Sequence, residues 1–192
     1  MAIRLYLGCS SGTHIQHQEM MERYGPLEEW EPSDKYVIGQ VYGKDIQQYD
    51  AMAVPYADDT VDTIYNSHLL EHLPHVVVPA TLKHWHDKLK PGGELIINVP
   101  DLEWLCVQTL RYCRGEAIES QHYNKLWGEE GLLHGFYGSQ SHAGEYHKSG
   151  YTKDTLQALL AAAGFVDIDV QQVVEAHDMG VLLATCRKHE RR

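Results

Sequence analysis

The chain has 192 residues, 43% of them hydrophobic and 22% charged, so it can form one globular domain with a substantial core. Its 16 basic and 27 acidic residues give a net charge of −11. That balance disfavours broad binding to nucleic acid or to an anionic membrane, because no cationic excess is available to neutralise phosphates. No apolar run approaches about 18 residues, so no transmembrane helix is predicted.

The cysteines and the first residues bear on the compartment. Four scattered cysteines form no C-x-x-C pair, which favours reduced thiols in a cytoplasmic protein over a disulfide framework. The opening stretch MAIRLYLGCSSG ends its apolar run in Gly and Ser, so it is interpreted as a strand and not as a signal peptide.

The first third of the chain predicts three strands and one helix. Residues 3–7 (IRLYL) predict a buried strand, followed by the turn GCSSGT and a helix over residues 14–24. Residues 25–34 predict a loop, because they contain two prolines and a run of acids. Residues 35–41 (KYVIGQV) and 45–52 (DIQQYDAM) predict the second and third strands.

The stretch VDTIYNSHLLEHLP, residues 61–74, predicts a strand that breaks into a helix. Such a junction places Asn66, Ser67 and His68 at the carboxyl end of a strand, the edge where open α/β sheets bind ligands. On the expected helix, His68, Glu71 and His72 stand at i, i+3 and i+4 and share one face.

Residues 76–89 predict a helix that the sequence KPGG stops, and residues 94–99 (ELIINV) predict a buried strand. Strands that alternate with helices in this way indicate βαβ units and a parallel sheet. After a helix at 102–114, residues 122–149 are rich in Gly, His, Tyr and Ser, and the whole span of about 102–150 is predicted to be a substrate-facing insertion in a single domain. Thr152 is a good N-cap for a helix that Gly164 ends, and residues 165–174 and 181–186 predict an antiparallel closing pair.

In order and spacing, these pieces resemble class I S-adenosylmethionine-dependent methyltransferases across nearly the whole chain. The motifs that carry the resemblance are LGCSSGT, DAMAVPYADDTVD, IYNSHLLEHL, LKPGGELIINVP and LLAAAGF. The nearest group is the compact one with S-S-H-V-L-E-H-like junctions, often associated with glycan or small-metabolite modification. The resemblance implies a Rossmann-like seven-stranded, mostly parallel sheet with an antiparallel C-terminal strand pair and helices on both faces.

The resemblance also implies which residues bind S-adenosylmethionine. The small residues of the first turn would pass under its methionine part, Asp50 would accept from the adenine amino group, and Ala51 and Met52 would pack on the ring. Asn66, Ser67 and His68 would lie beside the sulfonium. The residues carried over for the cofactor are Gly8, Cys9, Ser10, Gly12, Asp34, Asp50, Ala51, Met52, Asn66 and Ser67.

Two departures from the family pattern leave alternatives open. An acidic residue usually ends the second strand and binds the ribose hydroxyls. A strand at 35–41 would put Gln40 there, whereas a strand ending at Asp34 would supply the acid, and Asp34 is preferred. Many relatives also have lid helices before the first strand, so here the lid is expected from residues 122–149, from a second subunit in a homodimer, or from a partner.

The histidines allow two kinds of chemistry. H-x-x-E-H at residues 68–72 matches an inverted zinc-peptidase motif, but a strand ends too close for the long helix which that motif needs. Some methyltransferases hold a divalent cation at this junction together with a downstream histidine, which implies the metal ligands His68, Glu71, His72 and His147. Histidine ligands would favour Zn, Fe or Mn over Mg. Without a metal, His68 or His147 is the best candidate for a catalytic general base.

We therefore predict a cytoplasmic methyltransferase that acts on a small acceptor, most simply a hydroxyl of a sugar, glycan or small metabolite. The first alternative is a non-catalytic methyltransferase-fold subunit or scaffold, suggested by the serine-containing first motif. The second is a nucleotide-dependent oxidoreductase, which the absence of G-x-G-x-x-G disfavours.

Overall fold

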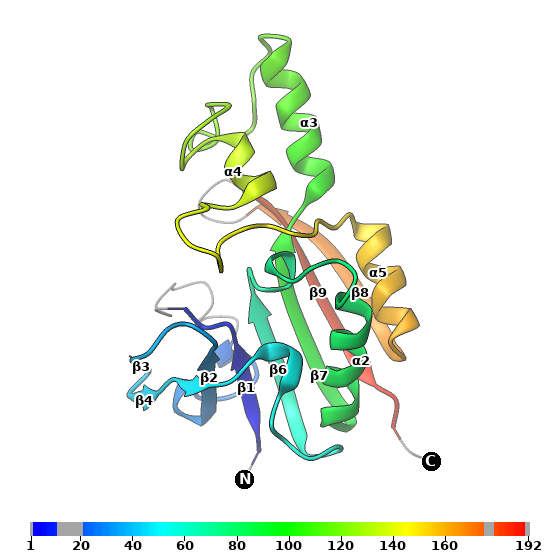
Figure 1. Ribbon diagram of the computed structural model, residues 1–192. Helices are drawn as coiled ribbons and strands as arrows, with labels where there is room; N and C mark the ends of the chain where they lie inside the picture. The colour runs from blue at the N-terminus through cyan, green and yellow to red at the C-terminus, as the bar shows by residue number, and fades with distance from the viewer. Residues whose placement is uncertain (1, 11–20, 175–178, 191–192) are drawn as a thin grey trace.

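The protein is described by a computed structural model that covers residues 2–10, 21–174 and 179–190. Its centre is a seven-stranded sheet in the order β5-β2-β1-β6-β7-β9-β8 (Figure 1). Neighbouring strands are parallel except that β9 runs antiparallel to both β7 and β8. The predicted Rossmann-like sheet with an antiparallel C-terminal pair is confirmed.

The strands of this sheet are β1 Arg4–Leu7, β2 Trp30–Asp34, β5 Gln47–Gln48, β6 Val61–Ser67, β7 Leu89–Pro100, β8 Phe165–Val174 and β9 Gly180–Lys188. A small hairpin consists of β3 Gln40–Val41 and β4 Lys44–Asp45. The helices are α2 Val78–Lys88, α3 Leu102–Cys113, α4 Leu132–Tyr137 and α5 Lys153–Ala162, and the 3-10 turns are η1 Leu27–Glu29, η2 Ala51–Ala53 and η3 Leu70–His72.

Alternation along β1 divides the core between the two faces of the sheet. Leu5 and Leu7 belong to the larger core cluster, which α2 and α5 cover with Trp85 and Leu160. Tyr6 points to the opposite face, where it joins a smaller cluster that includes Trp30, Tyr65 and Ile96. Helices α2 and α5 therefore cover one face, and the helix expected at residues 14–24 falls largely outside the described residues. None of the described helices combines the length and apolar character needed to cross a bilayer.

The predicted second strand was placed wrongly. Residues 35–39 form a loop, and β2 is Trp30–Asp34, inside the segment predicted to be a loop. Pro32 is tolerated because β2 pairs with β5 only at Ser33 and Asp34, so no donor is required from Pro32 on that side. The chain then turns because the Asp34 carboxylate accepts the N–H groups of Tyr36 and Val37, at 2.7 and 3.0 Å. Asp34 thus ends the strand, as preferred.

The helix expected after β6 is also wrong. His68 has a φ of +49°, a left-handed conformation that changes the direction of the backbone at the end of the strand. Only the three residues of η3 then form a helical turn before Pro74. His68 and Glu71 still lie together, with Nδ1 of the imidazole 3.2 Å from Oε1 of the carboxylate.

Most of the later elements are confirmed. Helix α2 stops at Lys88, directly before β7, and Asp101 caps α3 by accepting from the N–H groups of Glu103 and Trp104. Thr152 caps α5 with a reciprocal capping box to Thr155. The predicted third strand is shorter than expected, because only the two residues of β5 pair with β2.

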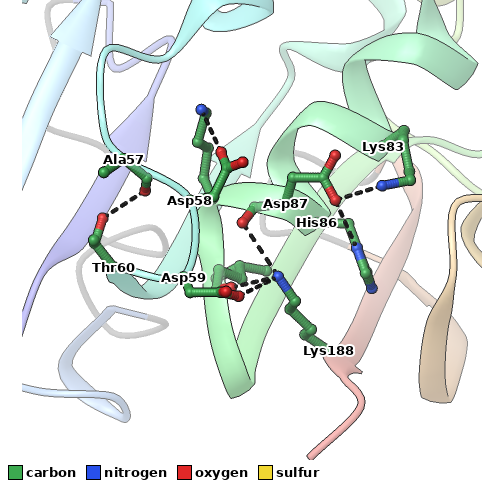
Figure 2. Close-up of polar contacts among 10 residues, drawn as sticks. Ala57, Asp58, Asp59, Thr60, Lys83, His86, Asp87 and Lys188 are labelled. Carbon is green, nitrogen blue, oxygen red and sulfur yellow. Dashed lines mark hydrogen bonds and ion pairs between the residues drawn. The ribbon is translucent and has the colours of Figure 1, made fainter. Parts of the chain in front are cut away.

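Ion pairs fasten the amino-terminal end of β6 to the end of β9 (Figure 2). Lys188 Nζ lies 2.7 Å from Asp59 Oδ1 and also donates to the backbone carbonyls of Asp87 and Leu89, at 3.2 and 2.9 Å. Lys88 Nζ reaches Asp58 Oδ1 at 2.7 Å. These contacts connect the carboxyl-terminal end of α2 to β9 and to the loop before β6. They have a structural role, since they lie away from the carboxyl edge of the parallel strands.

His86, beside this network, should make stability depend on pH. Its ring packs edge-on against Phe165, with ring centroids 5.1 Å apart. Burial, the largest influence, lowers the pKa of His86 below 6.5; Asp87 raises it, and the charges of Lys188 and Lys83 lower it further. The folded state therefore disfavours protonation of His86. The contribution of neutral His86 to the free energy of unfolding is complete above pH 6.5, and it is lost as the pH falls through 6.5 toward the lowered pKa.

We therefore expect the wild-type free energy of unfolding, measured by urea titration, to fall between about pH 7.5 and pH 5.5. His86→Gln should make that decline shallower, whereas the exposed His75→Gln should not change it. Equal declines in the wild type and in His86→Gln would contradict this assignment.

Candidate active site

A cavity of about 320 Å³ opens at the carboxyl edge of β1, β2 and β6. Four loops that follow strands supply one side of it: the residues after β1, β2, β5 and β6. The predicted cofactor and catalytic residues that line the cavity are Gly8, Ser10, Asp34, Asp50, Ala51, Met52 and His68. The structure thus brings together at one edge residues that are up to 60 positions apart in sequence.

Gly8 is required where the first turn meets the loop after β6. Its φ is +66°, and a Cβ atom there would lie 2.7 Å from a methyl group of Leu69. A larger residue would be strained by its backbone and would push the two loops apart. Gly8 therefore allows the turn after β1 to pack closely against Leu69.

The two predicted cofactor carboxylates are held differently. Asp34 accepts Ser10 N–H at 3.0 Å in addition to its two turn contacts, so it joins the loops after β1 and β2. Asp50 Oδ1 caps η2 by accepting Met52 N–H at 2.9 Å, and Oδ2 lies 2.7 Å from Lys35 Nζ. Burial raises the pKa of Asp50, but the Lys35 and Met52 hydrogen bonds and the Lys35 charge lower it overall. Asp50 is therefore an ionised acceptor at the cavity wall.

Three predicted cofactor residues lie beneath the cavity surface. Cys9 is buried, and burial, aided by the charge of Asp34, raises the pKa of its thiol to about 12. Asn66 and Ser67 are buried at the end of β6, and the side-chain amide of Asn66 has no hydrogen-bond partner among the described residues. Their roles in cofactor binding stay predictions, and Gly12 lies outside the described residues.

The segment around His147 is bound to the junction after β6, although some 75 residues separate them in sequence. The Glu71 carbonyl accepts the N–H groups of Lys148 and Ser149, at 2.7 and 3.1 Å. The Leu70 carbonyl accepts the hydroxyls of Ser149 and Tyr151, at 3.1 and 3.2 Å. The insertion therefore returns to the cavity, and its residues His142, Gly144, Glu145 and Lys148 line the wall.

Helix α4 orients His147. The His147 N–H donates to the Tyr137 carbonyl at 3.1 Å, and His147 Nδ1 lies 2.8 Å from the Gly135 carbonyl. A carbonyl only accepts, so Nδ1 carries the proton and the basic lone pair is on Nε2. His72 is fixed similarly, with Nδ1 3.3 Å from the Tyr146 carbonyl, and its ring meets that of His147 edge-on at 4.8 Å.

Glu71 is the buried anion of this cluster, with only 1% of its side chain exposed. Burial raises its pKa, but the His68 hydrogen bond and the charges of His68, His72 and His147 lower it overall, so the carboxylate is ionised. Burial lowers the pKa of His147, an effect that the Glu71 charge only partly offsets, so this imidazole is neutral near pH 7. An ionised carboxylate beside the neutral His147 imidazole can orient a base or bind a cation.

One ligand atom from each of Glu71, His72 and His147 lies within 4.8 Å of the others. Donor atoms about 2.1 Å from a shared ion lie within about 4.2 Å of each other, so metal binding would draw this set together slightly. Three of the four predicted metal ligands thus converge. His68 contacts Glu71 but is not part of the set.

Several residues of the cavity wall belong to no motif that the sequence predicts. Lys35, Tyr36 and Val37 line it from the loop after β2, which had been predicted to be a strand, and Tyr49 lines it next to Asp50. Glu145 and Lys148 line it from the insertion. Their only sequence signal is proximity to Asp34, Asp50 and His147.

Gly138 should prove essential to this arrangement. It follows α4 with a φ of +73°, and a Cβ atom would clash with the Glu145 carbonyl oxygen and lie 3.0 Å from the His147 ring. We expect Gly138→Ala to lower the free energy of unfolding by about 1–3 kcal/mol, measured by urea titration, because both the backbone and the contact are strained. Gly115→Ala is the matched control, with a φ of +70° but no atom within 4 Å of the added Cβ. Equal losses of unfolding free energy in Gly138→Ala and Gly115→Ala would show that the close contact with Glu145 does not contribute.

Comparison with known proteins gives the class. A family model described as a methyltransferase domain matches residues 7–170. A S-adenosylmethionine-dependent methyltransferase from Archaeoglobus fulgidus is 17% identical, with 97% of this chain and 86% of that one aligned and a TM-score of 0.62. Burkholderia thailandensis 1,6-didemethyltoxoflavin-N1-methyltransferase, solved with 1,6-didemethyltoxoflavin and S-adenosylhomocysteine, is 16% identical over 98% of this chain and 72% of that one, with a TM-score of 0.61.

A third similar structure is the methyltransferase solved in complex with the Haloferax volcanii Trm112 methyltransferase activator. It is 14% identical over 100% of this chain and 83% of that one, with a TM-score of 0.58. No curated protein sequence matches the chain. At these identities the structures show a shared fold, and the family model covers most of the chain.

The fold and the family match define a class I S-adenosylmethionine-dependent methyltransferase. This chain belongs to the methyltransferase domain family. Its predicted family is thereby confirmed.

Proposed function

We propose that this chain transfers the methyl group of S-adenosylmethionine to a hydroxyl of a small acceptor, such as a sugar, a glycan or a small metabolite. The observation that carries the proposal is the pairing of His68 with buried Glu71 at the wall of the cavity that also contains Asp34 and Asp50. Among the described residues, this arrangement joins the cavity at the carboxyl edge of the sheet to a candidate base.

His68 would act as the general base. Its Nδ1 faces Glu71 Oε1 at 3.2 Å, and because that carboxylate is ionised, Nδ1 donates and the basic lone pair is on Nε2. Glu71 would also stabilise the imidazolium that forms when His68 takes the acceptor proton. The left-handed backbone of His68 turns the residue toward the cavity at the end of β6.

The cofactor would occupy the side of the cavity formed by the loops after β1, β2 and β5. It supplies an activated methyl group, and the protein residues position it. Asp50 would provide an ionised acceptor for the adenine amino group, Asp34 would hold the ribose, and Gly8 would let the first loop approach closely. Positioning of this kind can supply much of the acceleration of an in-line displacement.

The converging Glu71, His72 and His147 favour a second mechanism at the same site. A divalent ion held by two imidazoles and one carboxylate would polarise the acceptor hydroxyl and lower its pKa. This donor set suits Zn, Fe or Mn better than Mg. The hydrogen bonds from Nδ1 of both histidines to backbone carbonyls are the contacts that usually orient metal-binding imidazoles.

Chelation separates the two mechanisms. If the ion takes part, prolonged treatment with a chelator should remove most activity, and Zn²⁺ or Mn²⁺ should restore it. His147→Ala should then abolish metal binding measured by calorimetry, while exposed His75→Ala should not. Elemental analysis would confirm that the metal has been removed. Full activity of the metal-free protein would exclude the metal mechanism and retain the His68 mechanism.

The direct test of the function is product formation. Purified protein is incubated with S-adenosylmethionine and pools of hydroxylated metabolites and glycosides, and S-adenosylhomocysteine is measured by mass spectrometry. We expect acceptor-dependent release that His68→Asn reduces. Failure to bind S-adenosylhomocysteine at millimolar concentration would instead favour the non-catalytic scaffold.

The same features support a proposal for the partners and the compartment. The insertion contributes part of the cavity wall, so it is the proposed lid, and a second copy of the chain or a partner could complete it. The neighbour solved with an activator subunit supports a test for such a partner by co-purification. The scattered cysteines support a reducing, cytoplasmic location.

A further inference from the structure

A second cavity, of about 390 Å³, lies in the insertion between the residues before α4 and those after it. Its volume falls at the lower end of the range for small-molecule sites. The side chains used in the argument below are Trp127, Glu129, His134, Tyr137, Ser139 and Gln140.

One short stretch of the insertion, residues 138–145, contributes to the walls of both cavities. Ser139 lines the second cavity and Glu145 lines the first, and Ser139 Oγ donates to Glu145 Oε2 at 3.1 Å. His142 Nε2, also in the wall of the first cavity, lies 3.5 Å from the other oxygen of Glu145. The hydrogen bond between Ser139 and Glu145 thus connects the walls of the two cavities. One extended molecule that displaced this hydrogen bond would reach both cavities.

The side chains indicate the chemistry of the occupant. Trp127 is 71% exposed and Tyr137 is 53% exposed, so two aromatic rings are available for stacking beside the imidazole of His134. Glu129 offers acceptors, while Ser139 and Gln140 both donate and accept, a set that matches hydroxyl groups. No lysine or arginine lines the cavity among the residues that the structure describes, so nothing there would neutralise a phosphate or carboxylate.

We propose that this cavity binds a neutral glycosyl ring, stacked on Trp127 and Tyr137, and holds the part of an extended acceptor that is remote from the methylated hydroxyl. The subsite role rests on the proposed function, but binding of the ring does not require the cofactor. The class of ligand is therefore a glycoside without anionic substituents.

The test uses the whole chain without cofactor and a panel of methyl glycosides of glucose, galactose, mannose and N-acetylglucosamine. We expect at least one to show saturation-transfer NMR signals with a Kd at or below about 10 mM. Trp127→Ala should weaken binding at least tenfold and Trp127→Phe less, because a ring is retained. Tyr112→Ala, an exposed aromatic of α3 that lines none of the described cavities, should not change it.

Absence of binding by the whole panel would overturn the proposal, as would equal losses in Trp127→Ala and Tyr112→Ala. Preferential binding of phenol or of a sugar phosphate would also overturn it, since either would show a different ligand class. S-adenosylhomocysteine binding, measured separately on the same samples, distinguishes these failures from failure of the proposed methyltransferase function.

Discussion

Saturating S-adenosylhomocysteine should raise the melting temperature of this protein by about 5–10 °C, and Asp50→Ala should remove that shift. A ligand present at about 100 times its Kd stabilises the folded state by about 2.7 kcal/mol, and a chain of this length gains about 2–4 °C per kcal/mol. Asp50 accounts for the effect because it is the ionised acceptor placed at the cavity wall after β5.

Asp50 also caps η2, so two controls are needed. Losing the cap should by itself lower stability by about 1 kcal/mol, and the measured quantity is therefore the ligand-induced shift and not the baseline. Asp50→Asn retains a cap, whereas the exposed Asp45→Ala removes an acid outside the cavity and should keep the full shift. A normal shift in Asp50→Ala would show that the adenine is bound elsewhere.

Replacement of His68 by Asn should lower kcat by about 10²–10⁴ and leave KM for S-adenosylmethionine nearly unchanged. Asn is chosen because it tolerates the left-handed backbone at this position but cannot take a proton near neutral pH. Glu71→Gln should also lower kcat, since an amide would not stabilise the imidazolium. The measurement is the initial rate of S-adenosylhomocysteine formation across pH.

His75→Ala provides the matched comparison, because this exposed histidine lies four residues beyond Glu71 and lines no described cavity. It should retain the wild-type rate. A His68→Asn variant with full activity would exclude His68 as the base and would leave the metal mechanism, which depends on His147.

The order of strands and helices could be predicted because the patterns are local and strong. Buried runs such as ELIINV, the Thr152 cap and Gly164 each specify their element without help from the rest of the chain. β2 could not be located because WEPSD has a proline and two acids, whereas KYVIGQV has a better strand composition. Pairing with β1 and the turn around the Asp34 carboxylate override that preference.

The candidate site was predictable in its residue types but not in its geometry. The helical spacing of HLLEH suggested that His68, Glu71 and His72 share a face. In the structure His68 has a left-handed backbone and contacts Glu71, but it is not part of the convergent set with His72. His147 was identified from a resemblance, whereas its orientation depends on the carbonyls of Gly135 and Tyr137 in α4. Such contacts between a short helix and a distant loop leave no periodic pattern in a sequence.

The strand order β7-β9-β8 has a consequence for synthesis on the ribosome. β9 follows β8 in sequence but lies between β7 and β8, so β8 has no partner in the sheet until β9 emerges. A nascent chain that ends before residue 180 therefore leaves the long edge of β7 unpaired and open to association with other chains. The backbone N–H of Asp101, the cap of α3, also bonds to the Gly180 carbonyl at 3.0 Å. The start of the insertion thus receives its support from a segment that is translated after β8.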